Sequence, residues 1–499
     1  MKTTRADPRP ADFTDVRATN LAVVLQHLRA NGPSSRASIA ASTGLNKATV
    51  SSLTGTLIEQ RLLRETGLSG NRIGRPGTAL TLDGSAYAAI GLQIAADRLT
   101  ALAVDFAGDQ LLLWHRQFDG APVAGHGHRS GARGGAAGSA GSPAGTLGGG
   151  DNPAGGSGGS TADRLGSASA SRFGGDSAGG LGSDSAGGFG RDSAGGFGGD
   201  SAGGFGGDSV GGFGGDWAGG LGGSPGRAIS AVAALAQRAA TRVRQQGRQV
   251  LGLTVAVPGL VTDGGAVRLS PSLGWADVDL RGLLSGSLRQ PGLDIAVANQ
   301  AGLAAIAELR HGGHPAASDL TYVTGAAGIE AGIVVDGRLL TGSRGFTGQI
   351  GRFSLGPAGS PTLADLAGVE QLVRRALPGL DPAALTDLTP AVEQVAIQAR
   401  SGDPAVLAAL RDTGCHLGQG LALLANLVNP ELIVLGDHYA TLAEWIRPAA
   451  EAELARNTLA PAAGGAGLTA STLGLHAAAL GGAVAHLDRI DTGTLPTAL

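Results

Sequence analysis

A run of short polar side chains near the N-terminus has the composition of a surface that hydrogen-bonds to nucleic-acid bases. It combines an amide, three hydroxyls and an ammonium group, namely Asn46, Lys47, Thr49, Ser51 and Ser52. On a helix that begins at Asn46, these positions lie on the face opposite the apolar residues Val50, Leu53 and Leu57. Amides and hydroxyls read base edges in the major groove of DNA, and lysine pairs with phosphate. The stretch therefore predicts DNA binding.

The flanking residues predict the helices that carry this face. Residues 35–61 read as two helices joined by a tight turn, with Ser35 as N-cap of the first and Asn46 as N-cap of the second. Gly44 suits the left-handed residue that ends the first helix. A preceding helix over residues 18–31 carries an apolar stripe, made of Leu21, Val24, Leu25 and Leu28. The pattern indicates a helix-turn-helix, although a helical hairpin that merely packs is the alternative.

The residues that follow favour a winged helix-turn-helix over the plain hairpin. Residues 62–66 and 78–82 read as two strands of a wing, with Arg72 and Arg75 at its tip. The negative potential of a minor groove attracts arginine. Residues 1–82 hold eleven Lys and Arg against five Asp and Glu, whereas the whole chain has a net charge of −3. This local positive excess predicts phosphate contacts and makes Arg72 and Arg75 candidate DNA-binding residues.

Length and composition limit the other classes of protein. A chain of 499 residues is long enough for two or three domains. The single cysteine, Cys415, excludes an internal disulfide and a thiolate zinc cluster within one chain. No apolar run reaches membrane-spanning length, and the first residues do not resemble a signal peptide. We therefore expect a cytoplasmic protein with no membrane partner.

Residues 120–226 form a low-complexity insert. Gly, Ser, Ala and Asp dominate it, and a unit of the type DSAGGFGG recurs from Asp176 to Asp216. A calcium-binding β-roll has a similar composition, but it follows a nine-residue pattern with a different arrangement of aspartate. The tract holds too little apolar mass to offset the entropy of ordering, so we expect a flexible surface loop.

Strands and helices alternate on both sides of the insert. Residues 88–118 predict three antiparallel strands. After the insert, helices are predicted at residues 228–247, 299–309, 364–377, 404–427 and 477–487. Strands are predicted at residues 250–257, 294–297, 319–324, 329–340 and 432–435. The alternation in two halves predicts an α/β fold with two lobes and a cleft.

Long motifs then follow one another in a recognisable order. They are GRPGTALTL, VAVPGLVTDGGAVRLSPSLGWADVDL, VANQAGLAAIAE, GIEAGIVVDGRLLTG, GFTGQIGRF and NPELIVLG. In these motifs the chain resembles the ROK family, which joins repressors and sugar kinases on a two-lobed, actin-like (ribonuclease-H-like) ATPase fold. The resemblance implies a winged helix-turn-helix domain at residues 1–84, a ROK domain at residues 85–119 and 227–499, and the insert at residues 120–226 between its two parts.

Residues that the family's kinases need are replaced in this chain. The resemblance places the first phosphate loop, Asp-x-Gly-Gly-Thr, at residues 93–97, which read Gln-Ile-Ala-Ala-Asp here. In the second phosphate loop Glu330 stands where phosphate oxygens would lie. The catalytic Asn-Asp pair reads Asn299-Gln300, and an amide cannot accept the proton of a sugar hydroxyl. We therefore expect no catalytic residue, no ATP cofactor and no enzyme activity.

The resemblance also implies where a sugar would bind. The family's motif Gly-Glu-x-Gly-His reads Gly348-Gln349-Ile350-Gly351-Arg352, and its zinc site is expected to be absent because residues 355–368 contain neither Cys nor His. The implied residues for a sugar or sugar-derivative effector are Asn299, Gln300, Gln349 and Arg352. Arg352 favours a negatively charged ligand. The alternative is a vestigial cleft that binds nothing.

Together these features predict a DNA-binding transcriptional regulator, a repressor of carbohydrate-related genes that binds a double-stranded operator. One winged helix reads few bases, so we expect a homodimer or homotetramer. Other functions stay open: an ATP-dependent ROK sugar kinase, a constitutive DNA-binding protein without effector, and a scaffold that depends on the Gly/Phe repeats.

Overall fold

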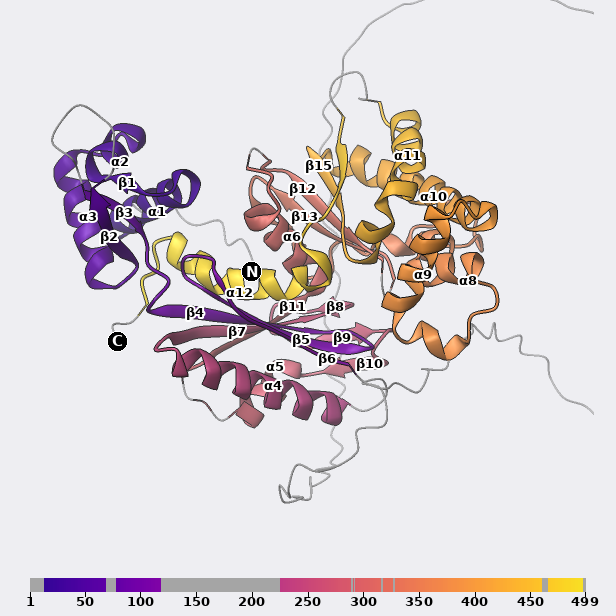
Figure 1. Cartoon of the computed structure of the whole chain (residues 1–499), viewed down its shortest axis with the longest axis horizontal. Coiled ribbons are helices and arrows are strands. Elements are labelled where there is room, and N and C mark those ends of the chain that lie inside the picture. Colours follow the sequence, from indigo (N-terminus) through magenta and orange to yellow (C-terminus); the bar gives the residue numbers. More distant parts are fainter. Residues whose placement is uncertain are drawn as a thin grey trace, which may run out of the picture. The chain divides into compact units, whose positions relative to one another are not determined.

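The computed structural model describes residues 13–68, 78–117, 225–288, 290, 292–315, 317–325, 328–459 and 465–496. Within these ranges, a small helical domain with a three-stranded sheet precedes two five-stranded sheets that carry helices (Figure 1). The predicted α/β class is confirmed. The tip of the predicted wing, with Arg72 and Arg75, and the predicted insert up to residue 224 lie outside the described residues.

The N-terminal domain is a winged helix-turn-helix. Its elements in chain order are α1 (Phe13–Asn31), β1 (Ser34–Ser35), α2 (Arg36–Thr43), α3 (Lys47–Glu59), β2 (Leu63–Leu68) and β3 (Thr78–Leu82). Strand β3 pairs antiparallel with both β1 and β2. The helix ends follow local chemistry as predicted, because Ser35 Oγ accepts a hydrogen bond from Ser38 N at 3.1 Å and Gly44 ends α2 with φ +73°. Both predicted apolar stripes are buried, namely Leu21, Val24, Leu25, Leu28, Val50, Leu53 and Leu57.

The first large sheet has the strand order β11-β7-β4-β5-β6. Its strands are β4 (Tyr87–Ile94), β5 (Arg98–Asp105), β6 (Gln110–Gln117), β7 (Gln249–Val257) and β11 (Asp294–Asn299). Strands β4, β5 and β6 are antiparallel, as predicted, and β7 runs parallel to both β4 and β11. Helices α4 (Pro225–Gln245) and α5 (Leu280–Leu288) cover one face, and α12 (Ala477–Asp491) covers the other (Figure 1). We call this sheet and these helices the first lobe.

A short antiparallel sheet extends the first lobe between β7 and α5. Its strands are β8 (Leu260–Val261), β9 (Val267–Ser270) and β10 (Trp275–Val278). Trp275 is fully buried in the core that α4, α5 and β7 share. The turn from β7 into β8 contains Gly259 at φ +98°, where an added Cβ would lie 2.3 Å from Leu269 O. A side chain at this turn would therefore clash with β9.

The second large sheet has the strand order β14-β13-β12-β15-β16. Its strands are β12 (Leu320–Thr324), β13 (Glu330–Val335), β14 (Arg338–Leu339), β15 (Leu432–Leu435) and β16 (Gly467–Ala470). Helix α6 (Gln300–His311) packs on β12, β13 and α12. The other helices of this second lobe are α7 (Leu363–Ala367), α8 (Val369–Ala376), α9 (Leu388–Arg400), α10 (Pro404–Val428) and α11 (His438–Asn457). In the described part of the chain, every helix is too short or too polar to cross a lipid bilayer.

Two predicted elements are wrong in extent. The predicted helix at residues 364–377 is split into α7 and α8, because Gly368 adopts an extended backbone with ψ 144° between them. The predicted strand at residues 329–340 is split into β13 and β14, because Asp336 and Gly337 both adopt positive φ in the turn. Neither break moves a candidate site residue to another element.

Candidate DNA-binding surface and ligand site

Helix α3 turns its predicted polar face to solvent. Lys47, Ser51 and Ser52 are exposed, and Thr49 is half-buried. Asn46 caps the helix, because its Oδ1 accepts a hydrogen bond from Thr49 N at 2.7 Å. Its carboxamide oxygen is therefore committed to the start of α3, and its amide nitrogen is the part that can donate to a base.

Two arginines brace α3 against the rest of the winged domain. Arg36 at the start of α2 donates to Thr54 Oγ1 at 3.1 Å and to Glu65 Oε1 in β2 at 3.0 Å. Arg17 in α1 donates to Thr56 Oγ1 at 2.8 Å. These contacts orient α3, and with it the polar face, relative to α1, α2 and the wing.

The candidate ligand residues meet around a carboxylate, Glu330, at the start of β13. Glu330 Oε1 accepts hydrogen bonds from Gly259 N at 2.8 Å and from Gln349 Nε2 at 3.2 Å. Glu330 Oε2 accepts from Asn299 Nδ2 at 3.2 Å. Gln300 also hydrogen-bonds to this carboxylate. Gly259 and Asn299 belong to the first lobe, so Glu330 joins the two lobes.

The environment of Glu330 is dry. Glu330 is 8% exposed. Burial raises the pKa of its carboxyl group above the ordinary value of 4.5. The hydrogen bonds from Gln349, Gly259, Asn299 and Gln300 act in the opposite direction and are outweighed. Sequence reasoning placed Glu330 in a phosphate loop and missed its contact with the sugar-site amides. The sequence did contain a sign of this contact. Gln300 and Gln349 replace acids of the family's motifs, while a new acid stands at position 330.

Asn299 fixes the start of α6 as well as contacting Glu330. Its Oδ1 accepts from Gly302 N at 3.1 Å, and its Nδ2 donates to Gly259 O at 2.8 Å. The structure therefore brings Gln349 together with the consecutive residues Asn299 and Gln300. Arg352 is exposed at the end of the 3-10 turn Ile350–Arg352 and lies outside this network of described contacts.

Gln93, from the segment that the family resemblance assigns to the first phosphate loop, lines a small cavity. Gln93, Gln300, Tyr322, Thr324 and Asp437 line a cavity of about 10 Å³, close to the smallest volume that holds one water molecule. Asp437 has φ +53°, and its Oδ2 accepts from Thr324 Oγ1 at 2.9 Å. The described residues that line this cavity include no Lys or Arg.

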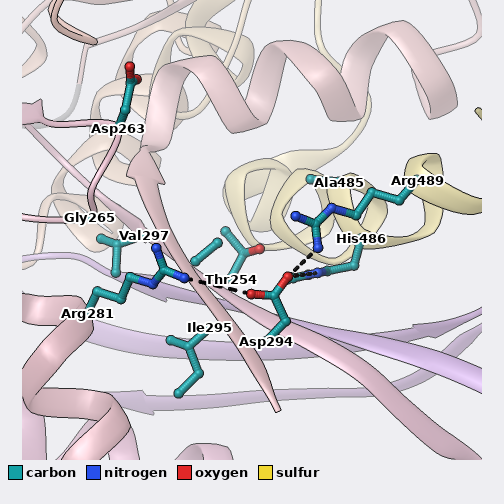
Figure 2. Close-up of a pocket in the computed structure, with 11 residues that line it drawn as sticks. Thr254, Asp263, Gly265, Arg281, Asp294, Ile295, Val297, Ala485, His486 and Arg489 are labelled. Carbon is teal, nitrogen blue, oxygen red and sulfur yellow. Dashed lines mark hydrogen bonds and ion pairs between the residues drawn. The ribbon is translucent and has the colours of Figure 1, made fainter. Parts of the chain in front are cut away.

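A larger cavity of about 290 Å³ lies beside Asp294, which begins β11, whereas Asn299 of the ligand site ends that strand (Figure 2). Arg281, His486 and Arg489 point toward the carboxylate of Asp294, with Arg281 Nη2 at 4.0 Å and His486 Nδ1 at 3.8 Å from its oxygens. Burial lowers the pKa of His486, which keeps its ring neutral. Asp294 begins β11 and Asn299 ends it, so this cavity is separate from the candidate ligand site.

Residues 227–488 match the sequence model of the ROK family. The chain belongs to the ROK family. Residues 18–67 match the IclR helix-turn-helix domain, which agrees with the three-helix domain and its wing.

Curated relatives include both repressors and a kinase. The xylose repressor of Bacillus spizizenii (strain ATCC 23059 / NRRL B-14472 / W23) is 21% identical over 476 residues, covering 94% of this chain and 95% of that protein. The xylose repressor of Caldicellulosiruptor bescii is 26% identical over 220 residues, covering 41% of this chain and 54% of the repressor, so this match spans about half of its length. A glucokinase of Halalkalibacterium halodurans is 26% identical over 252 residues, covering 47% of this chain and 75% of the enzyme.

A solved structure shares the fold over nearly the whole chain. It is the crystal structure of a ROK family transcriptional regulator, a homologue of the E. coli MLC protein. The two chains superimpose with a TM-score of 0.63 at 17% identity, covering 96% of this chain and 98% of the other. This similarity confirms the fold of a ROK lobe pair preceded by a helix-turn-helix region.

Proposed function

We propose that this chain is a DNA-binding transcriptional repressor of carbohydrate-related genes, and that its ROK lobes sense a sugar-like ligand without phosphorylating it. The observation that carries the proposal is the exposed polar face of α3, which Asn46 caps and two arginines brace. The relatives named as xylose repressors support the same function, because one of them aligns with 94% of this chain.

The kinase alternative has specific evidence on both sides. A glucokinase is among the relatives, and the lobes have the family's fold. Against catalysis, Gln300 stands where a general base is required, and an amide does not take up a proton at neutral pH. The described lining of the cavity beside Gln93 and Gln300 also lacks a Lys or Arg that could pair with the phosphates of ATP. These features favour binding without turnover.

Helix α6 offers a physical route from the ligand site to the DNA-binding domain. Asn299 caps its start and His311 ends it, and Arg310 near its end pairs with Asp488 of α12 at 3.3 Å. Helix α12 in turn pairs with α1 of the winged domain through Asp491 and Arg29. A ligand that prefers one position of α6 would therefore shift the balance between two positions of the winged helix.

The proposal extends to the assembly. A repressor with one winged helix contacts few base pairs, and a two-fold symmetric homodimer or homotetramer would place two of them on a palindromic operator. The ligand residues proposed for the sensing lobes are Asn299, Gln300 and Gln349, which share the carboxylate of Glu330, whereas the exposed Arg352 lies outside that network.

The test of DNA binding starts from a selection of bound sequences out of a random duplex library, followed by affinity measurements at several salt concentrations. Lys47→Ala should weaken binding and lower the slope of log K against log salt by about one, as for the loss of one phosphate contact. Arg238→Ala is the matched control, because Arg238 is an exposed basic residue on α4 of the first lobe. Selection of no preferred sequence, or equal salt slopes in all three proteins, contradicts the assignment of α3.

A further inference from the structure

The ligand site contains one carboxylate in a position that the family resemblance did not predict. Positions 300 and 349, where the family's kinases carry acids, hold Gln300 and Gln349. Both amides, together with Asn299, instead hydrogen-bond to Glu330. The carboxylate of the site is therefore at Glu330, the first residue of β13, and not at positions 300 and 349.

No positive charge in this network offsets that carboxylate. Its hydrogen-bonding partners are the backbone N–H of Gly259 and the side-chain amides of Asn299, Gln300 and Gln349, all of them neutral. The exposed Arg352 takes no part in the network of described contacts. Any ligand that enters between these groups meets an uncompensated buried carboxylate with amide donors around it.

We propose that Glu330 is the specificity-determining residue of the ligand site, and that it selects uncharged polyols such as neutral monosaccharides over sugar acids and sugar phosphates. This inference rests on the proposed function, because it requires that the site takes a ligand. It reverses the sequence-based expectation that Arg352 favours an anionic ligand.

The chemistry of hydroxyl groups explains the selection. A sugar hydroxyl donates one hydrogen bond and accepts others, so it can insert between an amide N–H and the carboxylate and satisfy both. Each broken amide–carboxylate contact is thereby replaced, and no buried polar atom loses its partner. A carboxylate or phosphate on the ligand accepts hydrogen bonds but cannot donate them when ionised, and its charge is repelled by Glu330 in a dry environment.

The test measures binding of ligand pairs that differ in charge to the full-length protein by titration calorimetry. Suitable neutral probes are D-xylose, D-glucose and N-acetylglucosamine, and the charged counterparts are D-glucuronate and D-glucose 6-phosphate. Wild-type protein should bind at least one neutral sugar at least about tenfold more tightly than the charged counterparts, which corresponds to about 1.4 kcal/mol. Glu330→Gln should reduce that ratio, because it keeps the shape of the side chain and removes its charge. Glu370→Gln, which removes an exposed carboxylate of α8, should leave the ratio unchanged.

Several results would overturn the inference. Tighter binding of the acid or the phosphate by wild-type protein contradicts it directly, even if Glu330→Gln does not fold. A discrimination ratio that survives Glu330→Gln assigns selectivity to another residue. If wild-type protein binds its selected DNA but no neutral sugar at millimolar concentration, the ligand inference is wrong while DNA binding stands. If neutral sugars bind and no DNA sequence is selected, the repressor proposal fails while the ligand class stands.

Discussion

The guanidinium group of Arg29, at the end of α1, lies 2.5 Å from the carboxylate of Asp491 in α12. Arg29 also donates to Phe106 O at 3.1 Å, and its guanidinium lies 4.9 Å from the centre of the Phe106 ring. The side chain of Asp491 is 5% exposed, so the carboxylate of this ion pair is buried. One arginine thus ties the winged domain both to the last helix and to β5's end.

Arg29→Ala should uncouple ligand binding from DNA binding. The change leaves the buried carboxylate of Asp491 without its cation, so we expect a loss of about 1–3 kcal/mol in the free energy of unfolding. More specifically, ligand affinity should persist while the effect of ligand on DNA affinity becomes smaller. Denaturant unfolding and DNA binding with and without ligand measure the two effects. Arg447→Ala is the control, because it removes an exposed ion pair with Glu451 inside α11, away from the contacts between α6, α12 and α1. An unchanged ligand effect in Arg29→Ala contradicts the role of this contact.

Two substitutions of Asn46 should separate its role as the N-cap of α3 from its role in DNA recognition. Asn46→Ala removes the cap on α3 and should destabilise the protein by about 1 kcal/mol. Asn46→Asp keeps an oxygen that accepts from Thr49 N, so stability should be retained, but its negative charge should weaken DNA binding. Thermal unfolding and gel-shift titration of both variants check this. If Asn46→Asp binds DNA as tightly as the wild type, Asn46 does not face DNA.

Much of the winged domain could be predicted because its determinants are local. Ser35, Gly44 and Asn46 act within three or four residues of their own positions, and the stripe of Val50, Leu53 and Leu57 is visible in the sequence alone. Helix α11 could not be predicted in this way, because Pro448 lies inside it and proline ordinarily ends a helix. Packing of α11 against α10 outweighs that local preference.

The contacts of the ligand site could not be predicted either, because they join residues that are far apart in the sequence. Glu330 contacts Gly259, Asn299 and Gln349, which lie 71, 31 and 19 residues away in the sequence. A motif comparison assigns each of these residues to its own loop and does not reveal that they share one carboxylate. The fold was therefore predictable in outline, and the electrostatics of the site were not.

Glu330 should leave a signature in the pH dependence of stability. Because burial raises the pKa of this carboxyl group in the folded protein, the folded state holds the proton more tightly than the unfolded state does. Glu330 therefore contributes stability at low pH that is lost as the pH rises from about 4.5 through its raised pKa. The free energy of unfolding of the wild type, relative to Glu330→Gln, should decrease across that window. A difference that is constant or increases with pH contradicts a raised pKa of the Glu330 carboxyl group.

The low-complexity insert should be dispensable for folding and DNA binding. Residues 121–223 can be replaced by a short Gly/Ser linker that ends before α4, which begins at Pro225. Closure of a flexible loop costs about 0.6 kcal/mol more for each doubling of its length, so shortening it should change stability little. Yield, thermal unfolding and DNA affinity of the deletion variant measure this. Loss of folded protein would show that the repeats have a structural role.

We propose that the ROK lobes bind a neutral sugar without turnover and that this binding controls the affinity for DNA. The most direct measurement titrates the neutral sugars against full-length protein bound to its selected operator, with ATP and magnesium present and ADP formation followed in the same samples. We expect one sugar to change operator affinity by about 5–150-fold, equivalent to about 1–3 kcal/mol of coupling, with no ADP formed. Operator affinity that stays constant at saturating sugar, or ADP formation that depends on the sugar, would contradict it.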